Sequence, residues 1–216
     1  MITNVLVTGL SGSGILLFSR ILADLLASKG YAISTKDCLG TAHRATLVIT
    51  EIRYSADQEE FTNFIPYGGA DLLVGFEPLE TLRLGALYAK RGGRVIMNTR
   101  RVMPTFETLG RDIFSPEPRP LGYPETPWII DYLRQLGAGV VAFDATARAE
   151  EVGHHMSMNV VMLGALAACG GLEVAAEEIE TIVAQRAPKG SAERNLAAFR
   201  RGHAAALEAL ASPAAA

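Results

Sequence analysis

The chain has 216 residues, 49% of them hydrophobic and 20% charged, so it is long enough to bury a substantial core. Lysine and arginine (20) nearly balance aspartate and glutamate (23), and the net charge of −3 argues against nucleic acid as a partner. The longest apolar stretch, residues 156–169, is shorter than the roughly 20 residues that span a membrane. The first residues lack the pattern of a signal peptide. We therefore expect a soluble cytoplasmic protein with no membrane span.

The first third of the sequence predicts strand, glycine turn and helix. Residues 4–8 form a β-branched run, residues 9–14 are rich in glycine, and residues 15–30 carry apolar side chains at helical spacing. Residues 31–35 and 46–54 are typical of two further strands.

The remainder repeats the alternation of strands and helices. Strands are predicted at 72–76, 94–98 and 139–143, with a leucine-rich helix between the first two and another helix after the third. Residues 159–172 predict a buried helix, and residues 174–185 and 191–210 predict amphipathic helices. The expected fold class is α/β, an open and mostly parallel Rossmann-like sheet with helices on both faces. We assign residues 1–210 to a single domain and expect residues 211–216 to fray.

Six of the ten prolines fall between Pro104 and Pro127. Proline has no backbone N–H and interrupts regular elements, so residues 104–128 are expected to form a largely irregular arm. The aromatic side chains of this arm either face a partner or pack on the chain's own core.

The glycine-rich turn has two open interpretations. Gly9, Gly12 and Gly14 would allow a phosphate or diphosphate to approach backbone N–H groups at a helix N-terminus, or they make a tight turn and nothing more. The spacing G-x-x-G-x-G departs from the dinucleotide pattern G-x-G-x-x-G, because Ser11 stands where its second glycine belongs. Asp37, near the end of the second strand, is the candidate for a ribose contact. The G-K-S or G-K-T of a P-loop is missing.

Other polar residues give no catalytic or metal assignment. Glu77 either caps the helix that begins near Pro78 or contributes to a ligand site. Asn98, at the end of the next strand, likewise has either a structural role or a role in a ligand site. Asn159 is expected to satisfy local backbone groups. His154 and His155 are adjacent, so on a helix they would point about 100° apart and could not form an i, i+4 metal pair.

Several segments, in order, resemble the small, gamma-type subunits of the 2-oxoacid:ferredoxin oxidoreductase family, most closely the indolepyruvate type. The segments are residues 9–30, 40–46, 70–83, 122–124 and 159–166. The first loop of that family commonly reads G-x-G-G-Q-G, which Gly9, Gly12 and Gly14 match and from which Ser11 and Ser13 depart. The second commonly reads G-M-A-Q-R-G-G, with matches at Gly40, Ala42 and Arg44 and departures at His43, Ala45 and Thr46. These departures suggest a divergent paralogue.

The resemblance implies a division of labour. Thiamine diphosphate and 4Fe–4S clusters would lie on a larger partner subunit of a hetero-oligomer, which oxidatively decarboxylates an arylpyruvate-like 2-oxoacid to an acyl-CoA. The small subunit would be inactive alone and would help to hold coenzyme A (CoA). The implied CoA-binding residues are Gly9, Ser11, Gly12, Ser13, Gly14, His43 and Arg44.

The residues themselves agree with that division and leave one alternative. Cys38 and Cys169 are far apart and neither belongs to a C-x-x-C, so they cannot supply a cluster site and are expected to be free thiols. Arg44 would contact a phosphate or form a salt bridge at a surface or between subunits. The alternative function is a stand-alone nucleotide- or CoA-binding α/β protein.

Overall fold

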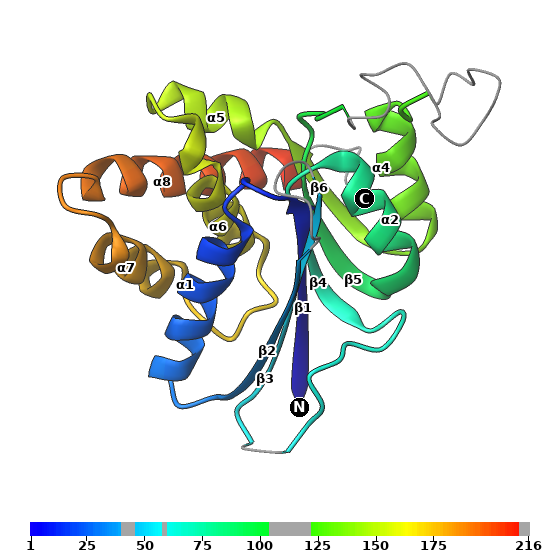
Figure 1. The fold of residues 1–216 in the computed structure, drawn as a ribbon, viewed down its shortest axis with the longest axis horizontal. Coiled ribbons are helices and arrows are strands. Elements are labelled where there is room, and N and C mark those ends of the chain that lie inside the picture. The colour runs from blue at the N-terminus through cyan, green and yellow to red at the C-terminus, as the bar shows by residue number, and fades with distance from the viewer. Residues whose placement is uncertain (40–45, 58–59, 104–121, 212–216) are drawn as a thin grey trace.

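A computed structural model of the chain describes residues 1–39, 46–57, 60–103 and 122–211. The described residues form one six-stranded sheet in the order β2-β3-β1-β4-β5-β6 (Figure 1). The strands are β1 (Ile2–Leu10), β2 (Ala32–Leu39), β3 (Leu47–Ser55), β4 (Ala70–Gly75), β5 (Ala89–Asn98) and β6 (Gly139–Phe143). Strands β1, β4, β5 and β6 pair in parallel, and β3 is antiparallel to both of its neighbours. The predicted α/β class with a mostly parallel sheet is confirmed.

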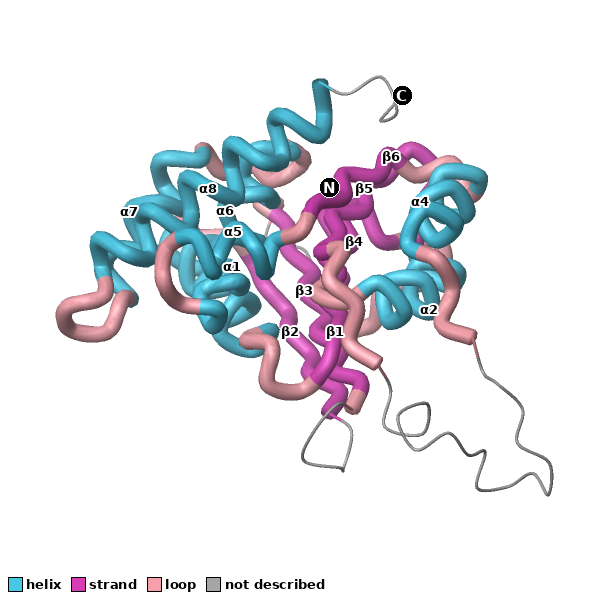
Figure 2. The backbone as a smooth tube through the Cα atoms, turned by 90° about the horizontal axis from the view of Figure 1, so that it is seen from above, coloured by secondary structure: helices cyan, strands magenta, loops and turns pink. Residues whose placement is uncertain are grey.

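Helices cover both faces of the sheet, as predicted (Figure 2). One face carries α1 (Ile15–Ser28), α5 (Ala145–Glu151), α6 (Met158–Cys169), α7 (Ala176–Arg186) and α8 (Ala192–Ala211). The other carries α2 (Pro78–Tyr88) and α4 (Thr126–Gln135). No helix in the described part of the chain is long and apolar enough to cross a membrane.

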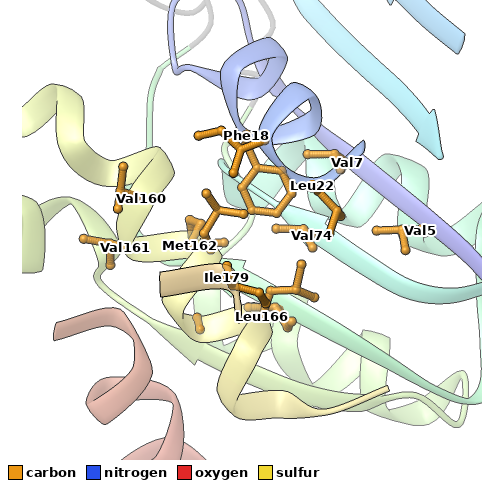
Figure 3. Close-up of a cluster of buried hydrophobic side chains, with 14 of the residues drawn as sticks. Val5, Val7, Phe18, Leu22, Val74, Val160, Val161, Met162, Leu166 and Ile179 are labelled. Carbon is orange, nitrogen blue, oxygen red and sulfur yellow. The ribbon is translucent and has the colours of Figure 1, made fainter. Parts of the chain in front are cut away.

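The larger core lies between α1, the sheet and α6 (Figure 3). Helix α1 buries Phe18 and Leu22 against Val7 of β1 and Val74 of β4. The ring of Phe18 meets that of Phe76 edge to face, with centroids 5.5 Å apart. These contacts fix the start of α1 relative to the end of β4, because close-packed side chains resist displacement.

Helix α6 is buried on nearly all sides and touches α8 through glycines. A methyl group at Gly164 would overlap the Phe199 carbonyl, and one at Gly202 would overlap the Val161 carbonyl. The two backbones therefore approach more closely than any residue with a side chain would permit at these positions.

The proline-rich arm is shorter than predicted at its C-terminal end. Helix α4 begins at Thr126, and Pro127 lies within its first turn, where a missing N–H costs no hydrogen bond. Tyr123 packs on the core of this chain, whereas Trp128 is 52% exposed and stacks on Tyr132. Residues 104–121 of the arm lie outside the described residues, as do residues 212–216 of the expected frayed tail.

The contact between α6 and α8 predicts that Gly202→Ala lowers the folding stability, whereas the same change usually raises it in a helix. At an exposed helical position this change stabilises by about 1 kcal/mol, whereas here the new methyl would overlap a carbonyl and should destabilise by about 1–3 kcal/mol. Urea unfolding of the full chain measures the difference. Ala204→Ser, at an exposed position of the same helix, serves as the control and should change stability by less than about 0.5 kcal/mol. Equal stability of G202A and the control would show that the two helices can separate without cost.

Candidate functional site

Four parallel strands end at one edge of the sheet, and the glycine loop leaves β1 there (Figure 1). From β1 the chain passes through α1 to β2 on one side, and from β4 it passes through α2 to β5 on the other. The strand order therefore reverses between β1 and β4. In open α/β sheets, ligands bind in the crevice that forms at such a reversal.

The loop from Leu10 to Gly14 is a tight turn that requires glycine at two positions. The Ser13 N–H donates to the Leu10 carbonyl at 3.2 Å, and Gly12, the third residue of this turn, has a φ of 92°. Gly14, which precedes α1, has a φ of 87°. Both values lie in the left-handed region that glycine adopts without strain. The glycines therefore make a tight turn, and neither ligand binding nor a purely structural role is decided by this geometry.

Some hydrogen-bond donors of the loop are already bonded within the chain, and others are free among the described residues. The Ser11 N–H donates to the Thr46 carbonyl at 2.8 Å, and both the N–H and the hydroxyl of Ser13 donate to the Leu10 carbonyl. Ser13, expected to donate to a ligand, is therefore engaged within the turn. In the described residues, the N–H groups of Gly12 and Gly14 meet no acceptor.

The start of α1 adds to this donor set. The first helical hydrogen bond of α1 runs from the Phe18 N–H to the Gly14 carbonyl, at 3.0 Å, so the N–H groups before Phe18 have no partner within the helix. No acidic residue lies in the first turn. No atom of the described residues outside the loop itself lies within 4 Å of the position that a Gly12 Cβ would occupy. Free N–H groups, an uncompensated helix dipole and open space together suit a phosphate or diphosphate.

Two glycines of the loop also serve packing. Gly9 is buried within β1, where a methyl group would come within 2.7 Å of the Phe76 Cβ. A methyl group at Gly14 would lie 3.0 Å from the Asn159 Cβ, so the loop rests directly on the start of α6. The side chain of Asn159 accepts from the Val160 N–H at 2.9 Å, the local backbone contact expected of it.

The remaining predicted ligand residues, His43 and Arg44, lie outside the described residues. Thr46, the first residue described after them, receives the Ser11 hydrogen bond. Asp37 does not lie where a dinucleotide fold needs an acid, because β3 separates β2 from β1 and the Asp37 carboxylate accepts from the Thr50 hydroxyl at 2.6 Å.

Glu77 caps α2, which is one of the two roles predicted for it. Its carboxylate accepts from the Glu80 N–H at 3.0 Å, and Pro78 opens the helix. Sequence reasoning missed its second partner, Tyr123, whose hydroxyl donates to Glu77 and accepts from the Leu79 N–H at 3.0 Å. Burial, and then the neighbouring Glu77, raise the pKa of Tyr123. The sequence offered one indication that Tyr123 has a role, because residues 122–124 are among the segments that resemble the family.

Asn98 holds the neighbouring strand ends together. Its amide donates to the Phe76 carbonyl at 3.0 Å and to the Thr146 hydroxyl at 3.2 Å, and its oxygen accepts from the Ala145 N–H at 3.0 Å. These bonds engage both ends of the side chain, so Asn98 positions the edge of the sheet and leaves no group for a ligand.

Comparison with known proteins decides the family. Residues 4–205 match the family described as Pyruvate ferredoxin/flavodoxin oxidoreductase. The chain belongs to this family. The resemblance read from the sequence is thereby confirmed.

Relatives in this oxidoreductase family match the chain over almost its whole length. The indolepyruvate oxidoreductase subunit IorB of Methanothermobacter thermautotrophicus is 35% identical over 205 residues, covering 95% of this chain and 98% of the relative. The keto/oxoacid ferredoxin oxidoreductase gamma subunit of Geobacter sulfurreducens shares the fold with a TM-score of 0.66 at 21% identity, over 95% of this chain and 99% of that one.

A third similar structure is a longer chain. The 2-oxoglutarate:ferredoxin oxidoreductase of Magnetococcus marinus, solved with 2-oxoglutarate, coenzyme A and succinyl-CoA bound, aligns with a TM-score of 0.65 at 18% identity. The alignment covers 96% of this chain but 31% of that chain. The fold of this oxidoreductase family member therefore also occurs as one part of a longer polypeptide.

The cysteines and histidines of this family member form no metal centre in the described part of the chain. Cys38 is exposed on β2, Cys169 is buried in α6, and both are free. Burial raises the pKa of the Cys169 thiol to about 11, which keeps it protonated and unreactive at neutral pH. The rings of His154 and His155 stack with centroids 5.9 Å apart.

Glu80 predicts a pH dependence of stability. One of its carboxylate oxygens is buried without a partner, and burial, reinforced by Glu77 and opposed by Arg83, raises its pKa. A raised pKa in the folded state means that the stability contributed by the protonated form is lost as the pH rises above about 4.5. Glu80→Gln should therefore be more stable than the parent at pH 8, and the gap should close near pH 4. Thermal unfolding across this range, with the exposed Glu193→Gln as control, would contradict the assignment if the gap were independent of pH.

Proposed function

We propose that this chain is the small subunit of an indolepyruvate-type 2-oxoacid:acceptor oxidoreductase. The enzyme would convert an arylpyruvate-like 2-oxoacid and CoA to an acyl-CoA and carbon dioxide, passing two electrons to an acceptor. The observation that carries the proposal is the family match over residues 4–205, together with relatives named indolepyruvate oxidoreductase subunits that align over 93–98% of their own length. A cytoplasmic location remains a prediction from the sequence.

The redox cofactors would belong to a larger partner subunit. A 4Fe–4S cluster is held by four cysteine thiolates, and this chain has two cysteines in total. Cys38 and Cys169 lie on β2 and α6, on different elements, and one is exposed while the other is buried. The residues do not fit a cluster, so iron–sulfur chemistry would take place in the partner, and the family resemblance implies that thiamine diphosphate is bound there too.

The glycine loop fits the diphosphate of CoA. Its oxygens would lie in the space that the described residues leave open at Gly12. They would accept from the N–H groups of Gly12 and Gly14, which meet no acceptor among those residues, and from the first turn of α1. Gly9 and Ser11 shape the loop, and His43 and Arg44 remain predicted contacts. CoA supplies the thiol that takes up the acyl group, and this chain would bind and orient the opposite, anionic end of the molecule.

The division of labour predicts the behaviour of the purified protein. The tagged chain, isolated from its native cells, should carry with it a larger polypeptide that contains thiamine diphosphate and iron–sulfur clusters, while the chain produced alone should be colourless. Oxidation of arylpyruvates by the lone chain should be undetectable because it has no group that stabilises the carbanion or transfers the electrons. A chain recovered without any partner would favour a stand-alone CoA- or nucleotide-binding protein.

The loop predicts that Gly12→Val weakens CoA binding to the assembled complex at least tenfold, because a branched side chain would occupy the space where the diphosphate approaches. Gly30→Val is the matched control, since Gly30 has a φ of 80° and open space around it but lies at the far end of α1. Both variants should lose a similar amount of stability, about 1–2 kcal/mol. Calorimetric titration with CoA compares them. Equal CoA affinity in the two variants would leave the loop as a structural turn.

A further inference from the structure

A pocket of about 210 Å³ opens beside the glycine loop. Its wall includes Gly14 and Leu17 from the start of α1, Asn159 from the first turn of α6, and Ser191 and Arg194 from the start of α8. His154, in the connection before α6, also lines it. We call this the three-helix pocket, because the first turns of three helices meet there.

The lining of the three-helix pocket carries groups that attract an anion. The N-terminal end of a helix carries a partial positive charge, and α1 and α6 have no acidic residue in the first turn, whereas α8 has Glu193 there. None of the described residues that line the pocket is acidic. Arg194 meets no carboxylate within ion-pair distance among the described residues, whereas Arg200 on the same helix pairs with Glu180 at 2.7 Å. The pocket therefore favours an anion although the whole chain is negative.

Two polar groups that line this wall lack a partner among the described residues. The Asn159 side chain, on a residue that is 4% exposed, accepts from the Val160 N–H through its oxygen, but its amide nitrogen donates to no acceptor. The Nδ1 atom of the half-buried His154 is buried and unpaired. An unsatisfied buried polar group is unfavourable by about 1–3 kcal/mol, so such groups need an explanation. A bound anion that accepts from the Asn159 amide supplies one.

We propose that the three-helix pocket binds the 3′-phosphate on the ribose of CoA. This inference rests on the proposed function, because it takes the glycine loop as the site of the CoA diphosphate. Gly14 belongs both to that loop and to the wall of the pocket, so the two anionic groups of one ligand would lie side by side. The Arg194 guanidinium would donate two hydrogen bonds to the phosphate, the Asn159 amide would donate a third, and Leu17 would contact the apolar surface of the nucleoside.

The test is calorimetric titration of the assembled complex with CoA and with 3′-dephospho-CoA. Arg194→Gln should weaken binding of CoA about 10- to 100-fold and leave binding of 3′-dephospho-CoA unchanged. The parent complex should prefer CoA over 3′-dephospho-CoA by a similar factor. Arg201→Gln, an exposed arginine of the same helix paired with Glu151, is the control and should bind both ligands as the parent does. Arg194 is exposed, so the variant should retain its fold, which circular dichroism and complex recovery verify.

The outcomes separate this inference from the proposed function. Equal affinity of the parent for the two ligands, or an equal loss of both in Arg194→Gln, overturns the phosphate pocket. If Gly12→Val weakens both ligands while Arg194→Gln weakens neither, the loop site stands and the pocket fails. If the complex binds neither ligand, both proposals fail. A loss confined to CoA in Arg194→Gln supports the pocket.

Discussion

The backbone contact between α6 and α8 is the constraint on which the binding edge depends. Gly164 and Gly202 let the two helices touch without intervening side chains, and the apolar residues of α6 pack on the sheet and on α1 at the same time. A helix held on all sides cannot shift without opening the core. Its first turn is thereby fixed against Gly14, and the interaction that stabilises the helical layer also builds one wall of the glycine loop and of the three-helix pocket.

The β2–β3 hairpin gives the sheet edge a chemistry unlike that of a dinucleotide fold. With β3 inserted beside β1, the acid at the end of β2 is removed from the crevice and bonded to Thr50. A carboxylate next to the loop would accept from a free ribose hydroxyl but would repel a phosphorylated ribose. Among the described residues, the loop and the three-helix pocket have free N–H groups, an arginine that pairs with no carboxylate and no acidic lining residue. This arrangement agrees with the proposal of a phosphorylated nucleoside as ligand.

Periodicity in the sequence was enough to predict the strands, the glycine turn and the buried character of α6, because each depends on neighbours within a few residues. It placed the end of the arm too late, since Pro127 was treated as a helix breaker although it lies in the first turn of α4. It missed the bond between Tyr123 and Glu77, 46 residues apart, and the convergence of Gly14 with Arg194. It also treated Ser13 as a free donor, although its hydroxyl bonds back to Leu10. Patterns report which side chains are buried or polar, and only the fold determines which of them meet.

The negative net charge limits how this chain can hold an anion. A chain at −3 does not attract an anionic ligand over long distances, and the field of a helix end fades within about one turn. Recognition must then come from short contacts, which strengthen as water is excluded and the local dielectric falls. A partner subunit packed over this edge would provide that exclusion. Under the proposed arrangement the small subunit would set the affinity for one end of CoA, while the thiol, at the other end of a long flexible molecule, would reach the reacting atoms in the partner. A subunit that supplies no catalytic group would in this way control a reaction that it does not perform.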